Sequence, residues 1–135
     1  MGESVLSHRS ILIVDDDVRN TFALVSYLET LDMNIFTAEH GMDALEILQK
    51  NDQIEVVLMD IMMPVMDGYE TMRKMKENGV TADIPVIAVT ARAMKGDREK
   101  CLKAGASDYI SKPVNLAALL EKMERLISVS KNSNE

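Results

Sequence analysis

The chain has 135 residues, of which 47% are hydrophobic and 27% are charged, and its formal net charge is −7. This length suits a single domain with one core and leaves no room for a second, and the composition is that of an ordinary globular protein. The negative charge argues against a nucleic-acid surface and against contact with an anionic membrane, because both would repel the chain.

The two ends of the chain are polar. Residues 1–10 hold one arginine and no apolar stretch, so we identify no signal peptide, and no apolar run approaches the roughly 20 residues that span a bilayer. We predict a domain over 10–128, with 1–9 and 129–135 as polar termini or linker remnants. The single cysteine, Cys101, cannot form an internal disulfide, which fits a reducing, cytoplasmic location.

Five runs rich in strand-forming residues alternate with helical patterns. The predicted strands are 11–14, 34–38, 56–59, 85–89 and 108–110. The first, third and fourth runs are continuously apolar, as expected for central parallel strands that are covered on both faces. The second and fifth runs are mixed, which suits positions nearer the sheet edges.

The segments between the strands change to a helical period. The positions that indicate the helices are Val18, Phe22, Val25 and Leu28 or Glu29; Ala44, Leu45 and Leu48; Tyr69, Met72 and Met75 or Lys76; the segment 94–104; and Leu116, Leu119, Leu120, Met123 and Ile127. Asn115 is placed to cap the last helix. Strict alternation implies parallel strands joined by right-handed crossovers, and hence a three-layer α/β domain.

Polar residues follow four of the predicted strands. Asp15 and Asp16 follow the first strand, Asp60 the third, Thr90 the fourth, and Lys112 comes soon after the fifth. All of these positions lie at the carboxyl edge of an open parallel sheet, where ligands bind. We therefore expect the five side chains to meet at one site.

The charges of this set indicate a cation. Asp15, Asp16 and Asp60 sum to −3, and Lys112 returns +1. Two carboxylates about 4 Å apart near a surface repel by roughly 4 kcal/mol at an effective dielectric constant of about 20. An all-oxygen set favours Mg²⁺, and the lack of His and Cys disfavours Zn²⁺. A carboxylate beside Mg²⁺, a lysine and a threonine hydroxyl is suited to phosphoryl transfer, with the carboxylate as nucleophile.

Four motifs resemble those of response-regulator receiver domains over nearly the whole chain. They are Ile-Leu-Ile-Val-Asp15-Asp16-Asp17, Val-Leu-Met-Asp60-Ile-Met-Met-Pro64-Val-Met-Asp67-Gly68, Val-Thr90-Ala91 and Asp-Tyr109-Ile-Ser-Lys112-Pro113. The resemblance implies a flavodoxin-like (βα)5 sandwich whose five-stranded parallel sheet has the order 2-1-3-4-5.

The resemblance also implies a role for each residue of the acidic set. Asp60 would be the phosphoacceptor and a metal ligand, and Asp16 would bind Mg²⁺ directly. Asp15 would hold the metal mainly through water, and the backbone carbonyl of Met62 would complete the protein ligands.

The same resemblance places Lys112 and Thr90 in contact with the phosphoryl group. Tyr109 would change rotamer together with Thr90 as a switch, and the Lys112–Pro113 peptide bond would be cis. Met62 and Arg92 would lie beside the phosphoryl group and control the access of water.

Two stretches resemble the receivers of hybrid histidine kinases in particular: Val18-Arg19-Asn20 and the segment from Thr90 to Asp97. The implied phosphodonor is a histidine kinase or a histidine phosphotransfer domain that docks near the first helix, with Asn20 in the contact. We expect a monomer without nucleic-acid or membrane contacts.

These residue types also have ordinary structural roles. Asp15 and Asp16 alone could cap the first helix, Thr90 could be an ordinary residue at a strand end, and Tyr109 could be plain packing. We expect Asp17 to act as a helix cap and Asp67-Gly68 as a turn and helix start. We also predict that His8 and His40 are surface residues, that most methionines fill the core and loops, and that Cys101 is an inert thiol.

Two other functions are compatible with an aspartate and Mg²⁺ in an α/β fold. An Mg²⁺-dependent phosphatase of the haloacid dehalogenase type also uses an aspartate nucleophile, but it needs a second aspartate two residues later, where this chain has Met62. A pseudo-receiver that only binds partners normally lacks an acidic residue or the lysine, and this chain has all of them.

Overall fold

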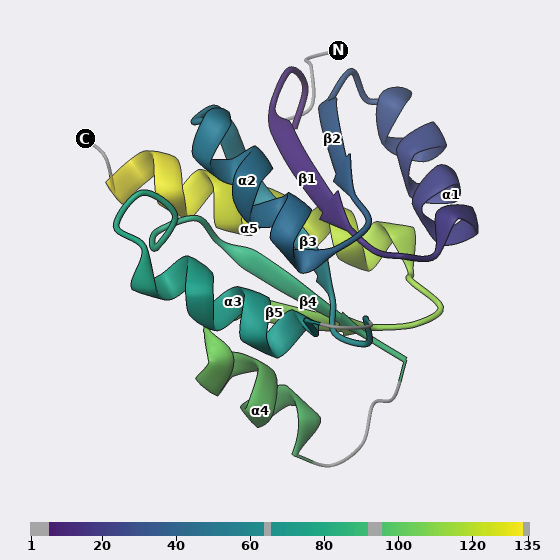
Figure 1. Cartoon of the computed structure of the whole chain (residues 1–135). Coiled ribbons are helices and arrows are strands. Elements are labelled where there is room, and N and C mark those ends of the chain that lie inside the picture. Colours follow the sequence, from purple (N-terminus) through teal and green to yellow (C-terminus); the bar gives the residue numbers. More distant parts are fainter. Residues whose placement is uncertain (1–5, 64–65, 92–95, 134–135) are drawn as a thin grey trace.

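The computed structural model describes residues 6–63, 66–91 and 96–133. Its elements follow one another as β1 (Ser10–Val14), α1 (Val18–Glu29), β2 (Asn34–Ala38), α2 (Gly41–Lys50), β3 (Ile54–Asp60), α3 (Gly68–Glu77), β4 (Val86–Thr90), α4 (Asp97–Ala104), β5 (Asp108–Ser111) and α5 (Leu116–Ser133) (Figure 1). Among the described residues, no helix combines the length and the hydrophobicity that crossing a bilayer requires.

The strands form one parallel sheet in the order β2-β1-β3-β4-β5. Every residue of β1 and β4 is buried, whereas β2 and β5 at the edges are partly exposed. This arrangement confirms the predicted flavodoxin-like sandwich, including the division into apolar central strands and mixed edge strands.

Helices cover both faces of the sheet and give three layers (Figure 1). Alternate strand residues point to opposite faces, so Ile11 and Ile13 pack with α1 and α5, whereas Leu12 and Val14 pack with α2, α3 and α4. The core is therefore divided into two clusters by the sheet, and the site at the end of the sheet lies between the two helical layers.

Three helices begin at the predicted capping residues. The Asp17 carboxylate accepts from the backbone N–H groups of Arg19 and Asn20, and the Asp67 carboxylate accepts from Glu70. The side chain of Asn115 accepts from the N–H of Ala118 at 2.9 Å. Each cap satisfies backbone donors that the first turn of a helix leaves without a partner.

Two of the apolar positions that indicated the first helix do not lie on its buried face. Val18 and Phe22 are 64% and 72% exposed. The buried residues of α1 are Leu24 and Leu28, which pack against the sheet beside α5. The helix is therefore rotated so that the two leucines face the sheet, and this rotation leaves an exposed apolar surface on its first turns.

Described structure is found on both sides of residues 10–128, and the limits of the domain stay a prediction. Leu6 is only 1% exposed and belongs to the core cluster between the sheet and helices α1 and α5, so packing begins before Ser10. Helix α5 continues to Ser133, past the predicted end at 128. Helix α4 begins at Asp97, and the predicted start of this helix near 94 lies outside the described residues.

Candidate functional site

The register of the sheet brings the predicted residues together. Val14 of β1 pairs with Met59 of β3, so Asp15 and Asp60, the next residues, end neighbouring strands. Asp60 itself pairs with Val89, the residue before Thr90. Thr90 pairs with Ser111, the residue before Lys112. The four strand ends thus meet at the carboxyl edge, as predicted.

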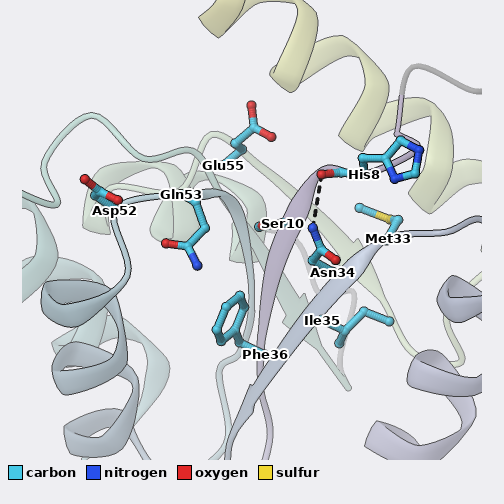
Figure 2. A pocket seen from close by; sticks show the side chains of 9 residues that line it. All are labelled: His8, Ser10, Met33, Asn34, Ile35, Phe36, Asp52, Gln53 and Glu55. Atoms are coloured by element: carbon cyan, nitrogen blue, oxygen red, sulfur yellow. Dashed lines mark hydrogen bonds between the residues drawn. The ribbon is translucent and has the colours of Figure 1, made fainter.

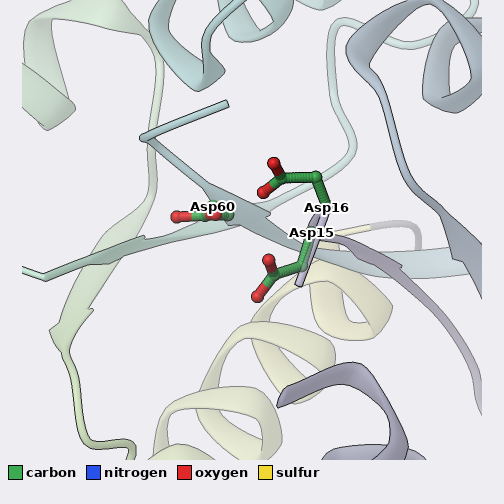
Figure 3. Close-up of side chains that lie close together, drawn as sticks. All are labelled: Asp15, Asp16 and Asp60. Atoms are coloured by element: carbon green, nitrogen blue, oxygen red, sulfur yellow. The ribbon is translucent and has the colours of Figure 1, made fainter. Parts of the chain in front are cut away.

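Asp15, Asp16 and Asp60 form one carboxylate cluster. One oxygen from each residue lies within 4.8 Å of the other two, and Figure 3 shows the side chains projecting from the ends of β1 and β3. Asp15 and Asp60 are 4% and 3% exposed, whereas Asp16 is open to solvent. An all-oxygen set with one exposed member suits a hard cation that keeps part of its water shell, which describes Mg²⁺.

Lys112 faces the two buried carboxylates. Its Nζ lies 3.6 Å from Asp60 Oδ1 and 3.8 Å from Asp15 Oδ2. The Lys112 backbone N–H donates to the carbonyl of Thr90 at 2.8 Å, which fixes the loop after β5 against β4. The Lys112–Pro113 peptide bond is cis, as predicted.

The cluster perturbs the ionisation of Asp60. Burial first, and then the charge of Asp15, raise the pKa of Asp60 to about 6. Lys112 and the Met62 N–H, which donates to Asp60 Oδ1 at 3.3 Å, oppose this rise. One lysine therefore does not fully offset the repulsion between the carboxylates, and the site can accept further positive charge.

Asp15 is held by a residue whose contact the sequence did not predict. The side-chain amide of Asn20 donates to Asp15 Oδ2 at 2.7 Å, and the backbone N–H of Asp17 donates to Asp15 Oδ1 at 2.8 Å. The sequence gives two signals for Asn20: the Val18-Arg19-Asn20 stretch and its position in the first turn of a helix that starts beside the cluster.

The loop between β3 and α3 carries Met62, whose side chain is 68% exposed. Gly68 begins α3 against this loop: a Cβ at Gly68 would lie 2.5 Å from the Asp60 carbonyl oxygen and 2.8 Å from Ile61 Cα. Only glycine permits this approach. Arg92 lies outside the described residues.

Thr90 and Tyr109 lie on one face of the sheet. Thr90 is 6% exposed, and Tyr109 pairs with Ala88, the residue two before Thr90. Ala88 and Tyr109 both contact the cluster on the α2–α4 side, and by alternation Thr90 shares that side. The two predicted switch residues are therefore neighbours across β4 and β5.

The degree of burial of the histidines, the methionines and Cys101 agrees with the structural roles that we predicted for them. His8 and His40 are exposed, whereas Met59, Met63, Met66, Met72 and Met75 are buried. Cys101 is buried on α4, and burial raises the pKa of its thiol, which keeps the thiol in its unreactive protonated form.

An open groove of about 750 Å³ lies at the opposite, amino edge of the sheet (Figure 2). It is lined by His8, Ser10, Met33, Asn34, Ile35, Phe36, Asp52, Gln53 and Glu55. The Asn34 amide bonds the His8 carbonyl, and Glu55 is paired with Arg9. The groove is separated from the carboxylate cluster by the length of the strands, and we assign no chemistry to it.

The family model described as "Response regulator receiver domain" matches residues 11–124. The chain is 41% identical over 113 residues to the sensor histidine kinase RcsC of Salmonella typhi, covering 84% of this chain and 12% of that protein. It is 37% identical over 116 residues to the response regulator PleD of Caulobacter vibrioides, covering 86% of this chain and 25% of that protein. The chain thus spans a small part of these relatives.

Solved structures agree with the family match. The receiver domain of sensor histidine kinase PA1611 from Pseudomonas aeruginosa, with a magnesium ion coordinated in its active-site cleft, has a TM-score of 0.82 at 33% identity, over 90% of this chain and 99% of that one. The receiver domain of Ssk1 from Saccharomyces cerevisiae, solved with the histidine phosphotransfer protein Ypd1, has a TM-score of 0.84 at 28% identity, over 94% of each chain. By its sequence, its strand order and these likenesses, the chain belongs to the family of response regulator receiver domains.

Proposed function

We propose that Asp60 accepts a phosphoryl group from a phosphohistidine donor in a two-component or phosphorelay system, in a reaction that depends on Mg²⁺. The observation that carries this proposal is the buried Asp60 carboxylate, within 4.8 Å of two other carboxylates and 3.6 Å from the Lys112 ammonium. The magnesium ion in the cleft of the PA1611 receiver supports the choice of cation.

Each residue of the site has a separate task in this proposal. An oxygen of Asp60 attacks phosphorus while the phosphorus–nitrogen bond to the donor histidine breaks, and the imidazole leaves with that electron pair. Lys112 offsets charge on the transferring oxygens, and the Thr90 hydroxyl donates to one of them. Asp16, Asp60, the Met62 carbonyl and, through water, Asp15 would hold Mg²⁺. The cation, when bound, would neutralise charge on the phosphoryl group. The domain acts as an acceptor and a signal, and does not turn over a substrate.

The proposed switch follows from the placement of Thr90 and Tyr109 on one face of the sheet. A phosphoryl group on Asp60 draws the Thr90 hydroxyl toward it, and the space that Thr90 leaves lets Tyr109 turn inward. The change would reach the surface around α4 and β5, and partners would read it there.

The direct test uses acetyl phosphate and the purified protein. With Mg²⁺, intact-mass measurement should find one added phosphoryl group, and an excess of chelator should prevent the addition. The proposal fails if no mass is gained, or if the gain is the same with and without the chelator.

The partner surface that we propose is the α1 patch, which we define as Val18 and Phe22. Both are exposed apolar residues on the helix that starts beside Asp15 and Asp16. An open groove of about 500 Å³ lies between α1 and the segment after β5, and Asn20 and Lys112 both line it. A helical phosphotransfer domain that covers the α1 patch would bring its phosphohistidine to Asp60, and the Ypd1–Ssk1 complex supports a partner of this kind.

Val18 has a matched control in this chain. Val80 is 65% exposed, much like Val18 at 64%, but it precedes β4 and so lies toward the amino edge of the sheet. We expect Val18→Ala and Phe22→Ala to slow transfer from a phosphohistidine domain by roughly tenfold each, because exposed apolar contacts of this size contribute about 1–2 kcal/mol to binding. Val80→Ala should not slow it.

All three variants should react normally with acetyl phosphate, which needs no docking surface. The measurement is the initial rate with each donor. Equal transfer rates for Val18→Ala, Phe22→Ala and Val80→Ala would contradict the α1 patch as the docking site and would leave Asp60 as acceptor unaffected.

Met62 should control the lifetime of the phosphorylated state. Its side chain is exposed beside Asp60 and offers no strong hydrogen-bonding group to orient an attacking water. Met62→Asn should therefore lose its phosphoryl group roughly fivefold faster, which corresponds to about 1 kcal/mol in the barrier. A decay time course in the same Mg²⁺ buffer checks this, and an equal or slower loss from the variant would show that Met62 does not shield the site.

A further inference from the structure

Asn20 connects the first turn of helix α1 to the carboxylate cluster. Its backbone N–H bonds the capping Asp17 at 3.4 Å, whereas its side-chain amide turns away from the cap and donates to Asp15 Oδ2 at 2.7 Å. The other oxygen, Asp15 Oδ1, accepts from the backbone N–H of Asp17 at 2.8 Å. Both oxygens of this buried carboxylate are thus held in place by the start of α1.

The bond from Asn20 acts on the same oxygen that Lys112 approaches. Asp15 Oδ2 lies 2.7 Å from the Asn20 amide and 3.8 Å from Lys112 Nζ. The terminal torsion of an aspartate is soft, so without the amide the carboxylate can turn toward the ammonium. Lys112 would then be drawn from Asp60, and the Asp15 oxygens would leave the position that suits a cation.

The amide of Asn20 is chemically suited to orienting Asp15 beside a cation. An amide is a neutral donor, so it orients Asp15 without adding positive charge to a cluster that has to attract a divalent cation. A lysine or arginine at the same position would orient Asp15 as well but would compete electrostatically with that cation.

We propose that Asn20 is a positioning residue that holds Asp15 in the orientation needed for Mg²⁺ binding; this inference rests on the proposed function of the site. Asn20 then contributes to phosphorylation from any donor, including one too small to touch α1. This role differs from that of the α1 patch, which acts on protein donors alone.

The test is calorimetric titration with MgCl₂ alone, on wild type, Asn20→Ala, Asp15→Ala and the double variant. Ser26, which is exposed further along α1, supplies the matched control Ser26→Ala. Asn20→Ala should bind Mg²⁺ about tenfold more weakly, at the lower end of the range for residues that orient metal ligands. In the Asp15→Ala background the same substitution should have no effect, because Asn20 acts through Asp15. Ser26→Ala should bind as wild type does.

Phosphorylation by acetyl phosphate gives the second readout. The Asn20→Ala rate should fall at low Mg²⁺ and recover when Mg²⁺ is saturating. Three results would overturn the inference: Mg²⁺ affinity of Asn20→Ala within twofold of wild type, an equal loss in both backgrounds, or a slower reaction with the protein donor only. If wild type itself binds no Mg²⁺, the proposed function fails as well, so the two failures are distinguishable.

Discussion

Asp60→Asn is expected to remain folded and to gain no phosphoryl group from acetyl phosphate, under conditions that modify wild type fully. The amide has nearly the shape of the carboxylate but is a poor nucleophile, and no other carboxylate of the cluster lies as close to Lys112, whose Nζ is 3.6 Å from Asp60. Intact-mass measurement checks the result. If the variant is modified to the same extent as wild type, Asp60 is not the acceptor.

The same substitution should stabilise the protein in the absence of divalent cations. Burial and Asp15 raise the pKa of Asp60 from 3.8 to about 6, which means that the fold disfavours the charged form of this residue. This rise in pKa lowers the free energy of unfolding at neutral pH by at most roughly 3 kcal/mol. We expect Asp60→Asn to gain about 2 kcal/mol, or about 8 °C in melting temperature, with a chelator present at pH 7.5.

The pH dependence of this gain has a definite sign. The folded-state pKa lies above the unfolded value, so wild type loses stability as pH rises from about 4 through about 6, while the asparagine variant does not titrate at this position. The two proteins should melt alike below pH 4 and differ most above pH 7. Added Mg²⁺ should raise the melting temperature of wild type by binding to the folded state. If the variant melts lower than wild type at pH 7.5, the inference that the carboxylates of the cluster repel Asp60 is wrong.

Lys112→Gln should slow phosphorylation by acetyl phosphate about a hundredfold, the usual effect of removing one charge-stabilising donor from an active site. Two effects act together. The variant loses the ammonium that offsets charge on the transferring oxygens, and the pKa of Asp60, which Lys112 lowers, rises further and reduces the fraction of ionised nucleophile. Mg²⁺ binding should not weaken, because the cluster becomes more negative.

The control for this prediction is Lys50→Gln. Lys50 is exposed and pairs with Glu46 on α2, so the substitution removes the same charge away from the site. Initial rates of phosphorylation by intact mass, together with Mg²⁺ titration, separate an effect on phosphoryl transfer from an effect on Mg²⁺ binding. A Lys112→Gln rate within about threefold of the Lys50→Gln rate would show that the ammonium has no part in the transfer.

Most of the fold was predictable because the apolar runs and the capping residues indicated the same strands and helices. Continuous apolar runs marked β1, β3 and β4 as central strands, and the capping residues Asp17 and Asp67 marked the starts of helices. The rotation of α1 was not predictable from its apolar pattern. Val18, Phe22, Val25 and Leu28 form one possible stripe and Leu24 and Leu28 another, and only packing against the sheet and α5 selects the second.

The candidate site was predictable for a topological reason. Parallel strands bring their carboxyl ends to one edge, so residues far apart in the sequence, such as Asp15, Asp60 and Lys112, had to meet there. The contact between Asn20 and Asp15 depends on the direction of a side chain in the first turn of α1, which no spacing rule determines. The exposure of Val18 and Phe22 was not predicted either, because it depends on the rotation of α1, which the apolar pattern does not determine.

The central claim is that the phosphoryl group is bonded to Asp60, and the most direct measurement locates that bond. Protein treated with acetyl phosphate and Mg²⁺ is reduced with borohydride, which converts an aspartyl phosphate to homoserine, and is then digested and sequenced by mass spectrometry. We predict homoserine at position 60 alone, and none when a chelator replaces Mg²⁺. Homoserine at position 15, 16 or any other aspartate, with position 60 unchanged, would contradict the account.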